Sequence, residues 1–158
     1  LDEAMERLAE IIERDLGIHI RDLPGSGAAG GLSAGILAFL HGSLCSGADL
    51  ICDSIDLDGH LQDADLIIVG EGSLDLQSAF DKASVTVARR SKQQNVPVLA
   101  VSGVLGPGHE ELFQHGIDEM ASIMGMGLSY NEAVNNAYSL LVSSTAKALR
   151  ASQIKFFS

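Results

Sequence analysis

The spacing of apolar residues divides the chain into two parts. In the first part, apolar residues three or four positions apart predict an amphipathic helix over residues 1–16, which ends at Gly17. The other elements expected there are helices over 32–40 and 47–55, a short strand over 18–20 and a polar turn over 56–63. This part therefore reads as mainly helical and rich in small residues.

The second part alternates between strand and helix. Two short, continuous apolar runs, 65–69 and 96–101, are each followed by glycine-containing loops, and a helix is expected between them over 81–95. Strands without polar alternation are typical of parallel sheets that are covered on both faces. The elements expected further on are a short helix over 109–115, a strand over 117–124 and one long helix that begins at the capping box Ser129–Glu132. The pattern predicts an α/β protein with a parallel sheet.

Composition narrows the function classes. The 158 residues carry a formal net charge of −11, which argues against a nucleic-acid partner, and residues 89–92 are interpreted as a solvated basic face. No apolar run reaches the roughly 18 residues of a membrane span. Two cysteines, Cys45 and Cys52, are too few for a disulfide framework. We expect reduced, mostly buried thiols and a cytoplasmic protein.

Residues 24–35 are rich in glycine and contain a G-x-G-x-x-G at 25–30. In a dinucleotide-binding turn this motif follows a strand, and an acidic residue such as Asp49 would come about 20 positions later. The charged segment 21–24 ends in proline and does not resemble a strand, which disfavours that interpretation. The glycines either allow close helix packing or form a turn whose backbone N–H groups hold an anion.

A polar segment follows the first apolar run. Glu71, Asp75 and Lys82 lie in and after the sequence Gly70–Asp75, where an open α/β sheet places its ligands. Carboxylates can hold Mg²⁺ and a lysine can meet a phosphate. The alternative is a turn with Asp75 as a helix cap and Lys82 on the surface. The second loop, Ser102–His109, is expected to line the same edge, with His109 as an acid, a base or simply a helix start.

Three segments together resemble the two-domain, type-1 glycerate kinase family: PGSGAAGGLSAGILAFL, DADLIIVGEGSLDLQSAFDKAS and NVPVLAVSG. The resemblance implies two α/β domains, one flavodoxin-like (Rossmann-like) and one inserted within it, with a cleft between them. It implies transfer of the γ-phosphoryl group of ATP to D-glycerate with Mg²⁺, giving 2- or 3-phosphoglycerate. The cytoplasmic enzyme would bind no nucleic acid and no membrane.

The resemblance also implies roles for individual residues. It implies catalytic roles for Asp75, Lys82 and Glu71, of which Glu71 and Asp75 could also hold the metal. The residues implied in binding substrate or phosphate are Gly25, Ser26, Gly27, Gly30, Gly31, Gly70, Gly72, Gln77 and Ser78. Residues 1–58 would belong to the inserted domain and 59–158 to the C-terminal part of the flavodoxin-like domain. The N-terminal remainder of such a protein would be a partner of this chain, which we expect to lack kinase activity alone.

The chain departs from the family pattern at three positions. Ser73 stands where the family usually has Arg, Asp81 where it has Gly, and Ser84 where it often has Pro. A serine cannot replace the bidentate binding of a carboxylate or phosphate by Arg. Two further interpretations therefore stay open: a divergent kinase-fold protein that binds another small hydroxy acid, and a non-catalytic ligand-binding or interaction domain.

Overall fold

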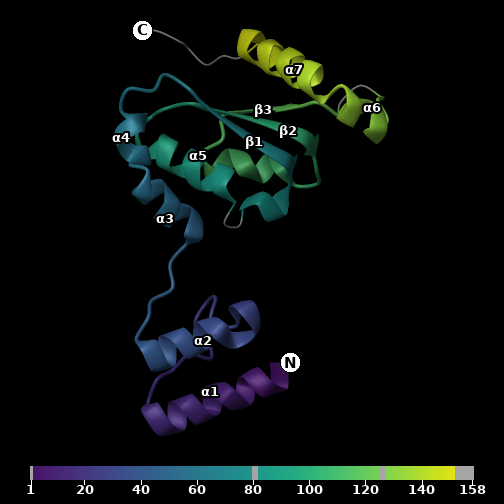
Figure 1. Cartoon of the computed structure of the whole chain (residues 1–158). Helices are drawn as coiled ribbons and strands as arrows, with labels where there is room; N and C mark the ends of the chain where they lie inside the picture. The colour runs from purple at the N-terminus through teal and green to yellow at the C-terminus, as the bar shows by residue number, and fades with distance from the viewer. Residues whose placement is uncertain (1, 80–81, 125–126, 152–158) are drawn as a thin grey trace. The chain divides into compact units, whose positions relative to one another are not determined.

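The structure of the chain is a computed structural model that describes residues 2–79, 82–124 and 127–151. It contains two compact units, Leu1–Ser46 and Gly47–Ser158 (Figure 1). Within the described residues, no helix is both long enough and apolar enough to cross a membrane. The predicted boundary between residues 58 and 59 concerns the domains of a whole family member and stays a prediction.

The first unit is a pair of helices, α1 (Asp2–Leu16) and α2 (Ala28–Leu40). Their shared core consists of Ala9, Ile12, Ile20, Ala34 and Ala38. The predicted strand over 18–20 is wrong, because this segment is irregular. No strand is described elsewhere in this unit to pair with it. Ile20 instead fills the space between the helices and is only 3% exposed.

The glycine-rich segment bends the start of α2. Ala29, Gly30 and Gly31 have positive φ angles of 52°, 65° and 93°, so the regular helix begins at Leu32, as the sequence predicts. A Cβ atom at Gly31 would collide with the side chain of Met5 on α1. Glycine at this position therefore permits both the left-handed backbone and the close approach of the two helices.

The second unit contains a parallel sheet in the order β1 (Ile67–Leu74), β2 (Val98–Leu105) and β3 (Glu119–Ser122). Helix α5 (Ala83–Gln93) packs against β1 and β2, and α7 (Ala137–Ala151) packs against β3 and β2 from the other face (Figure 1). The main core lies on the α5 face and consists of Val69, Leu74, Val85, Ala88, Val98, Ala100, Leu112 and Ile117. The predicted α/β class and β-α-β order are confirmed.

The strands and the C-terminal helix differ in extent from the prediction. β1 continues through residues 70–74 because these polar and glycine residues still pair with β2. The expected long helix is two helices, α6 (Tyr130–Asn135) and α7, which meet at Asn136. The capping box at Ser129 is confirmed. Two apolar side chains of this segment are largely exposed, Val134 at 54% and Tyr138 at 84%.

Four short helices complete the described part of the second unit: α3 (Gly47–Ser54), α4 (Leu57–Leu61) and the 3₁₀ helices η1 (Leu76–Ala79) and η2 (His109–His115). The polar turn predicted over 56–63 is therefore largely helical. Asp56 caps α4 by accepting a hydrogen bond from the Gly59 N–H, and Leu61 is completely buried. Both cysteines are free; Cys52 is buried as expected, but Cys45 is exposed.

A cluster of charges ties α3 and α4 to α5. The Arg90 side chain is only 12% exposed and forms ion pairs with Asp49 at 3.0 Å, Asp53 at 2.7 Å and Asp58 at 3.3 Å. The hydrogen bonds that the Arg90 guanidinium donates to Asp53 and Asp49 raise the pKa of Arg90 above its ordinary value. The prediction of a solvated basic face is therefore wrong for Arg90, because three carboxylates enclose its guanidinium group.

We expect Arg90→Ala to lower the melting temperature of the chain by several degrees, because it leaves three carboxylates without their shared counter-ion. Arg89→Ala is the matched control on the same helix. Arg89 is 55% exposed and forms an ion pair with Asp49, so its loss should cost much less. Thermal unfolding followed by circular dichroism measures both, and equal shifts for the two variants would contradict a bridging role for Arg90.

Candidate functional site

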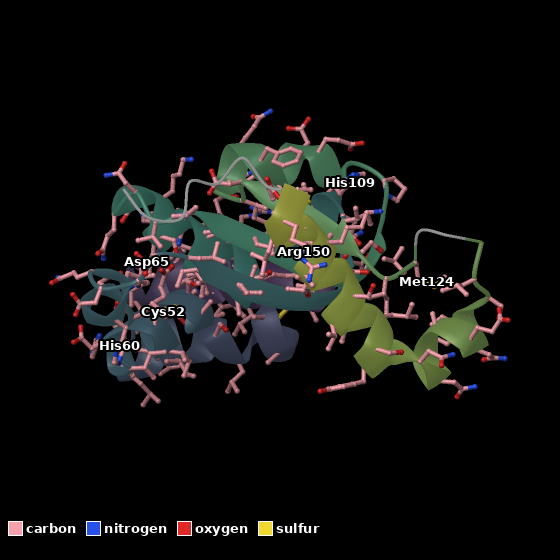
Figure 2. The ribbon with its side chains drawn as sticks, turned by 90° about the horizontal axis from the view of Figure 1, so that it is seen from above. Cys52, His60, Asp65, His109, Met124 and Arg150 are labelled. Atoms are coloured by element: carbon pink, nitrogen blue, oxygen red, sulfur yellow. The ribbon has the colours of Figure 1, made fainter. Side chains whose placement is uncertain are left out.

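The polar segments that follow the strands lie at one end of the sheet. Figure 2 places Asp65, which precedes β1, at the opposite end from His109 and Met124, which follow β2 and β3. This is the geometry expected when parallel strands run in one direction. The carboxyl end of the sheet is thus the candidate ligand edge of the second unit.

Glu71 occupies the carboxyl half of β1 and pairs in register with Ser102 of β2. It lines a cavity of about 510 Å³ together with Gly70, Gly72 and, from α7, Leu141 and Thr145. A Cβ at Gly72 would meet no atom within 4 Å, and one at Gly70 would meet only the Val101 carbonyl oxygen at 3.9 Å. Glycine therefore leaves bare backbone open to the cavity.

Asp75 and Lys82 converge just beyond β1. The Lys82 Nζ donates hydrogen bonds to the Ser73 carbonyl oxygen at 3.0 Å and to the Ser78 Oγ at 2.7 Å. The Asp75 carboxylate caps the 3₁₀ helix η1 (Leu76–Ala79) by accepting the Ser78 N–H at 3.0 Å. Asp75 caps a helix, as the turn interpretation predicts. Lys82 is half-buried and bonds to the end of β1, so it does not lie on the surface as that interpretation predicts.

The hydrogen bonds around Asp75 lower the pKa of its carboxyl group. The largest cause is the bond from the Ser78 hydroxyl; the Ser78 backbone N–H, the Lys82 charge and the Ser73 hydroxyl act in the same direction, and partial burial opposes them. Asp75 is therefore ionised at neutral pH and is a weak base. It suits orientation of a hydroxyl group better than removal of its proton.

The remaining predicted residues fall into two groups. Gln77 is exposed on η1, and His109 begins η2 with its Nδ1 2.9 Å from the Gly106 carbonyl oxygen. The predicted glycine-segment residues Gly25, Ser26, Gly27, Gly30 and Gly31 lie in the first unit. Ser26 and Gly27 line a separate cavity of about 340 Å³ there, together with Arg21 and Glu6, which form an ion pair.

The dinucleotide interpretation of the glycine segment is not supported. The structure has irregular backbone and turns, not a strand, at residues 17–27. Asp49, the acidic residue at the expected distance, forms ion pairs with Arg89 and Arg90. The close packing of Gly31 against Met5 agrees with the helix-packing interpretation at that position.

The acidic residues fit a magnesium ion only in part. Across the described ranges, no group of three or more histidine, cysteine, aspartate or glutamate side chains could hold a metal by itself. Mg²⁺ is often held by one or two carboxylates together with substrate phosphates and water. Glu71 has no hydrogen bond or ion pair in the described structure, so it fits this role better than Asp75, whose Oδ1 is already engaged.

The sequence motifs assign no role to two serines that the structure places at the candidate functional site. Ser73 supplies the carbonyl oxygen that holds Lys82. The hydroxyl of Ser102 is completely buried beside the register position of Glu71 and has no hydrogen-bond partner among the described residues. A serine at the end of an apolar run is the only sequence signal for Ser102, and it does not reveal that the hydroxyl is unpaired.

The parallel sheet and its polar carboxyl edge define an open-sheet α/β protein with a ligand edge, and comparison with known proteins specifies the family. The sequence matches the Glycerate kinase family over residues 1–153. It is 43% identical to a glycerate kinase of Halalkalibacterium halodurans over 89% of this chain and 37% of that protein. It is 37% identical to a glycerate kinase of Haemophilus influenzae over 99% of this chain and 41% of that protein.

A solved structure agrees with these relatives. The crystal structure of putative glycerate kinase 2 from Salmonella typhimurium LT2 superposes with a TM-score of 0.65 at 36% identity, covering 95% of this chain and 38% of that one. The chain belongs to the glycerate kinase family. It spans about two fifths of the length of the relatives that it matches.

We expect Ser102→Ala to raise the free energy of unfolding by about 1 kcal/mol, because it removes a buried hydroxyl that has no partner. Ser122→Ala is the matched control in the same register row. The Ser122 Oγ donates to the Gly103 carbonyl oxygen and accepts the Met124 N–H, so its loss should destabilise the chain. Urea unfolding of both variants gives the signs, and a destabilised Ser102→Ala would mean that this hydroxyl has a partner in solution.

Proposed function

We propose that the intact protein containing this chain is a glycerate kinase that transfers the γ-phosphoryl group of ATP to D-glycerate with Mg²⁺. One observation carries the proposal. In a member of this family, Asp75 and Lys82 converge on Ser78 just beyond β1, and Glu71, within the carboxyl half of β1, lines a cavity with two bare glycines. Phosphoryl transfer depends on positioning and charge stabilisation, which such groups provide.

Each side chain has a proposed part in this reaction. The Lys82 ammonium donates two of its three N–H groups to Ser73 and Ser78, so one N–H remains for a phosphate or the glycerate carboxylate. The ionised Asp75 orients the glycerate hydroxyl. Glu71 lines the cavity and would hold Mg²⁺ with the nucleotide phosphates, whose charge the ion neutralises. Gly70 and Gly72 let the substrate approach the backbone.

The wider setting belongs to the same proposal. The glycine segment Gly25–Gly31 and the exposed Gln77 contribute to substrate or phosphate binding. The remainder of the intact protein completes the active site, and the chain alone has no appreciable kinase activity. The net charge of −11 supports small-molecule substrates over nucleic acid. The two free cysteines support a cytoplasmic location.

We expect Glu71→Gln and Lys82→Met, each made in the intact protein, to lower kcat with D-glycerate by about 100-fold, because each removes charge at the reacting groups. Lys92→Met is the matched control. This exposed lysine pairs with Asp118 and precedes β2 at the amino end of the strand, so its loss should leave kcat unchanged. Glycerate-dependent ADP release measures the rates, and near-normal turnover in both site variants would refute these assignments.

Ser73 supports a second candidate, a kinase for another small hydroxy acid. Its hydroxyl is a poor substitute for the Arg that the family usually has, since it reaches only the Asp75 Oδ2, at 3.4 Å. If D-glycerate is the ancestral substrate, Ser73→Arg should raise kcat/KM for D-glycerate about tenfold by restoring a bidentate cation. Asp81, the neighbouring departure, lies outside the described residues.

Ser73→Lys is the control, because lysine restores the charge without the planar fork of donors. A rise with Arg but not with Lys would support the divergent enzyme. Unchanged kcat/KM for D-glycerate in both variants, with good turnover in the unmodified protein, would exclude it.

A further inference from the structure

Ser78 lies between the two charged groups that follow β1. It belongs to η1, three residues after Asp75 and four before Lys82, and it is completely buried. Most buried serines of this chain lie within strands or the α5 helix; Ser78 lies in a single turn of 3₁₀ helix between candidate catalytic residues. Its position raises the question of whether it contacts a ligand or acts through its neighbours.

The hydroxyl of Ser78 uses its full hydrogen-bonding capacity within the protein. Its oxygen accepts the Lys82 ammonium at 2.7 Å and the Asp75 backbone N–H at 3.1 Å. Its hydrogen faces two acceptors, the Asp75 Oδ1 at 3.0 Å and the Ser73 carbonyl oxygen at 3.3 Å. A hydroxyl has one donor and two acceptor sites, so none is left for a substrate.

We infer that Ser78 is a positioning residue that fixes the separation and orientation of the Asp75 carboxylate and the Lys82 ammonium. The inference rests on the proposed function, in which these two groups meet the substrate. It assigns Ser78 a role through its neighbours in place of the direct ligand contact expected from the family resemblance. The Ser78 hydroxyl is hydrogen-bonded to both groups, so a shift of either group changes the position of the other.

The bond to Ser78 also limits the freedom of Lys82. A lysine side chain has several rotatable bonds, and holding it in one arrangement costs entropy. With Ser78 present, the ammonium is anchored at two points, the Ser78 Oγ and the Ser73 carbonyl oxygen. Without the hydroxyl, one anchor remains, and the remaining N–H groups can turn away from the direction that the reaction needs. A misplacement of about 1 Å can cost roughly 100-fold in rate.

The test is Ser78→Ala in the intact protein, with steady-state kinetics of ADP release. We expect kcat to fall by about 100-fold while KM for D-glycerate changes little, because the binding groups stay and only their alignment is lost. Ser78→Thr keeps the hydroxyl and should recover most of kcat. Ser84→Ala is the matched control, since this buried serine of α5 has a hydroxyl without a partner and should leave kcat unchanged.

A second measurement does not depend on activity. In the present chain, carboxyl NMR titration should give Asp75 a higher pKa in Ser78→Ala than in the unmodified chain, because the largest cause of its lowered pKa is removed. The rise should be partial, because the backbone N–H of residue 78 still reaches the Asp75 Oδ1. Ser84→Ala should leave the Asp75 pKa unchanged. If Ser78→Ala does not fold, Ser78→Cys serves in both measurements, since a thiol is a weak hydrogen-bonding group.

The outcomes separate the two proposals. If Lys82→Met loses activity but folded Ser78→Ala keeps its kcat, the positioning role is refuted and the proposed function stands. If the intact protein phosphorylates no glycerate, the proposed function fails. The positioning role is then decided by the titration, which refutes it if the Asp75 pKa is the same in Ser78→Ala and the unmodified chain.

Discussion

The parallel pairing of β1 with β2 continues past Val69 as far as Leu74, and the candidate site depends on this continuation. Glu71, Ser73 and Leu74 are held in register by Ser102, Val104 and Leu105. A Cβ at Gly103 would lie 2.6 Å from the Gly72 carbonyl oxygen, so glycine at position 103 permits this close approach of the strands. Were β1 to end at Val69, the Ser73 carbonyl oxygen would have no fixed place from which to hold Lys82.

This pairing explains which parts of the fold and site could be predicted from the sequence. Apolar runs reveal a strand wherever its side chains are buried, so β1 and β2 were predicted with the helix between them. The extension of β1 over residues 70–74 was not, because four polar or glycine residues separate the apolar run from the buried Leu74. The strand predicted over residues 18–20 is wrong for a different reason. Their alternation predicted a strand, but the unit that contains them offers two helices and no strand partner in the described residues.

The candidate site is predicted from the sequence in its residue types but not in its connections. The spacing of Glu71, Asp75 and Lys82 after an apolar run predicts a ligand edge of an α/β sheet, and this role stays a prediction. Whether Lys82 reached a ligand or lay on the surface could not be decided from spacing, because its partners are a backbone carbonyl and a buried hydroxyl. Contacts of this kind depend on the local path of the chain, which residue identity alone does not specify.

The charges at this edge favour a metal-assisted reaction. Among the described residues of the site, Glu71 and Asp75 contribute two negative charges and Lys82 one positive charge. The lowered pKa of Asp75 keeps its charge present at neutral pH. In the proposed reaction, a nucleotide and glycerate would add further negative charge, so their binding at this edge would require additional cations. Arg at position 73 would supply such a cation, but Ser73 does not. In the proposed kinase, the additional positive charge would therefore come from Mg²⁺ near Glu71 and from the remainder of the intact protein.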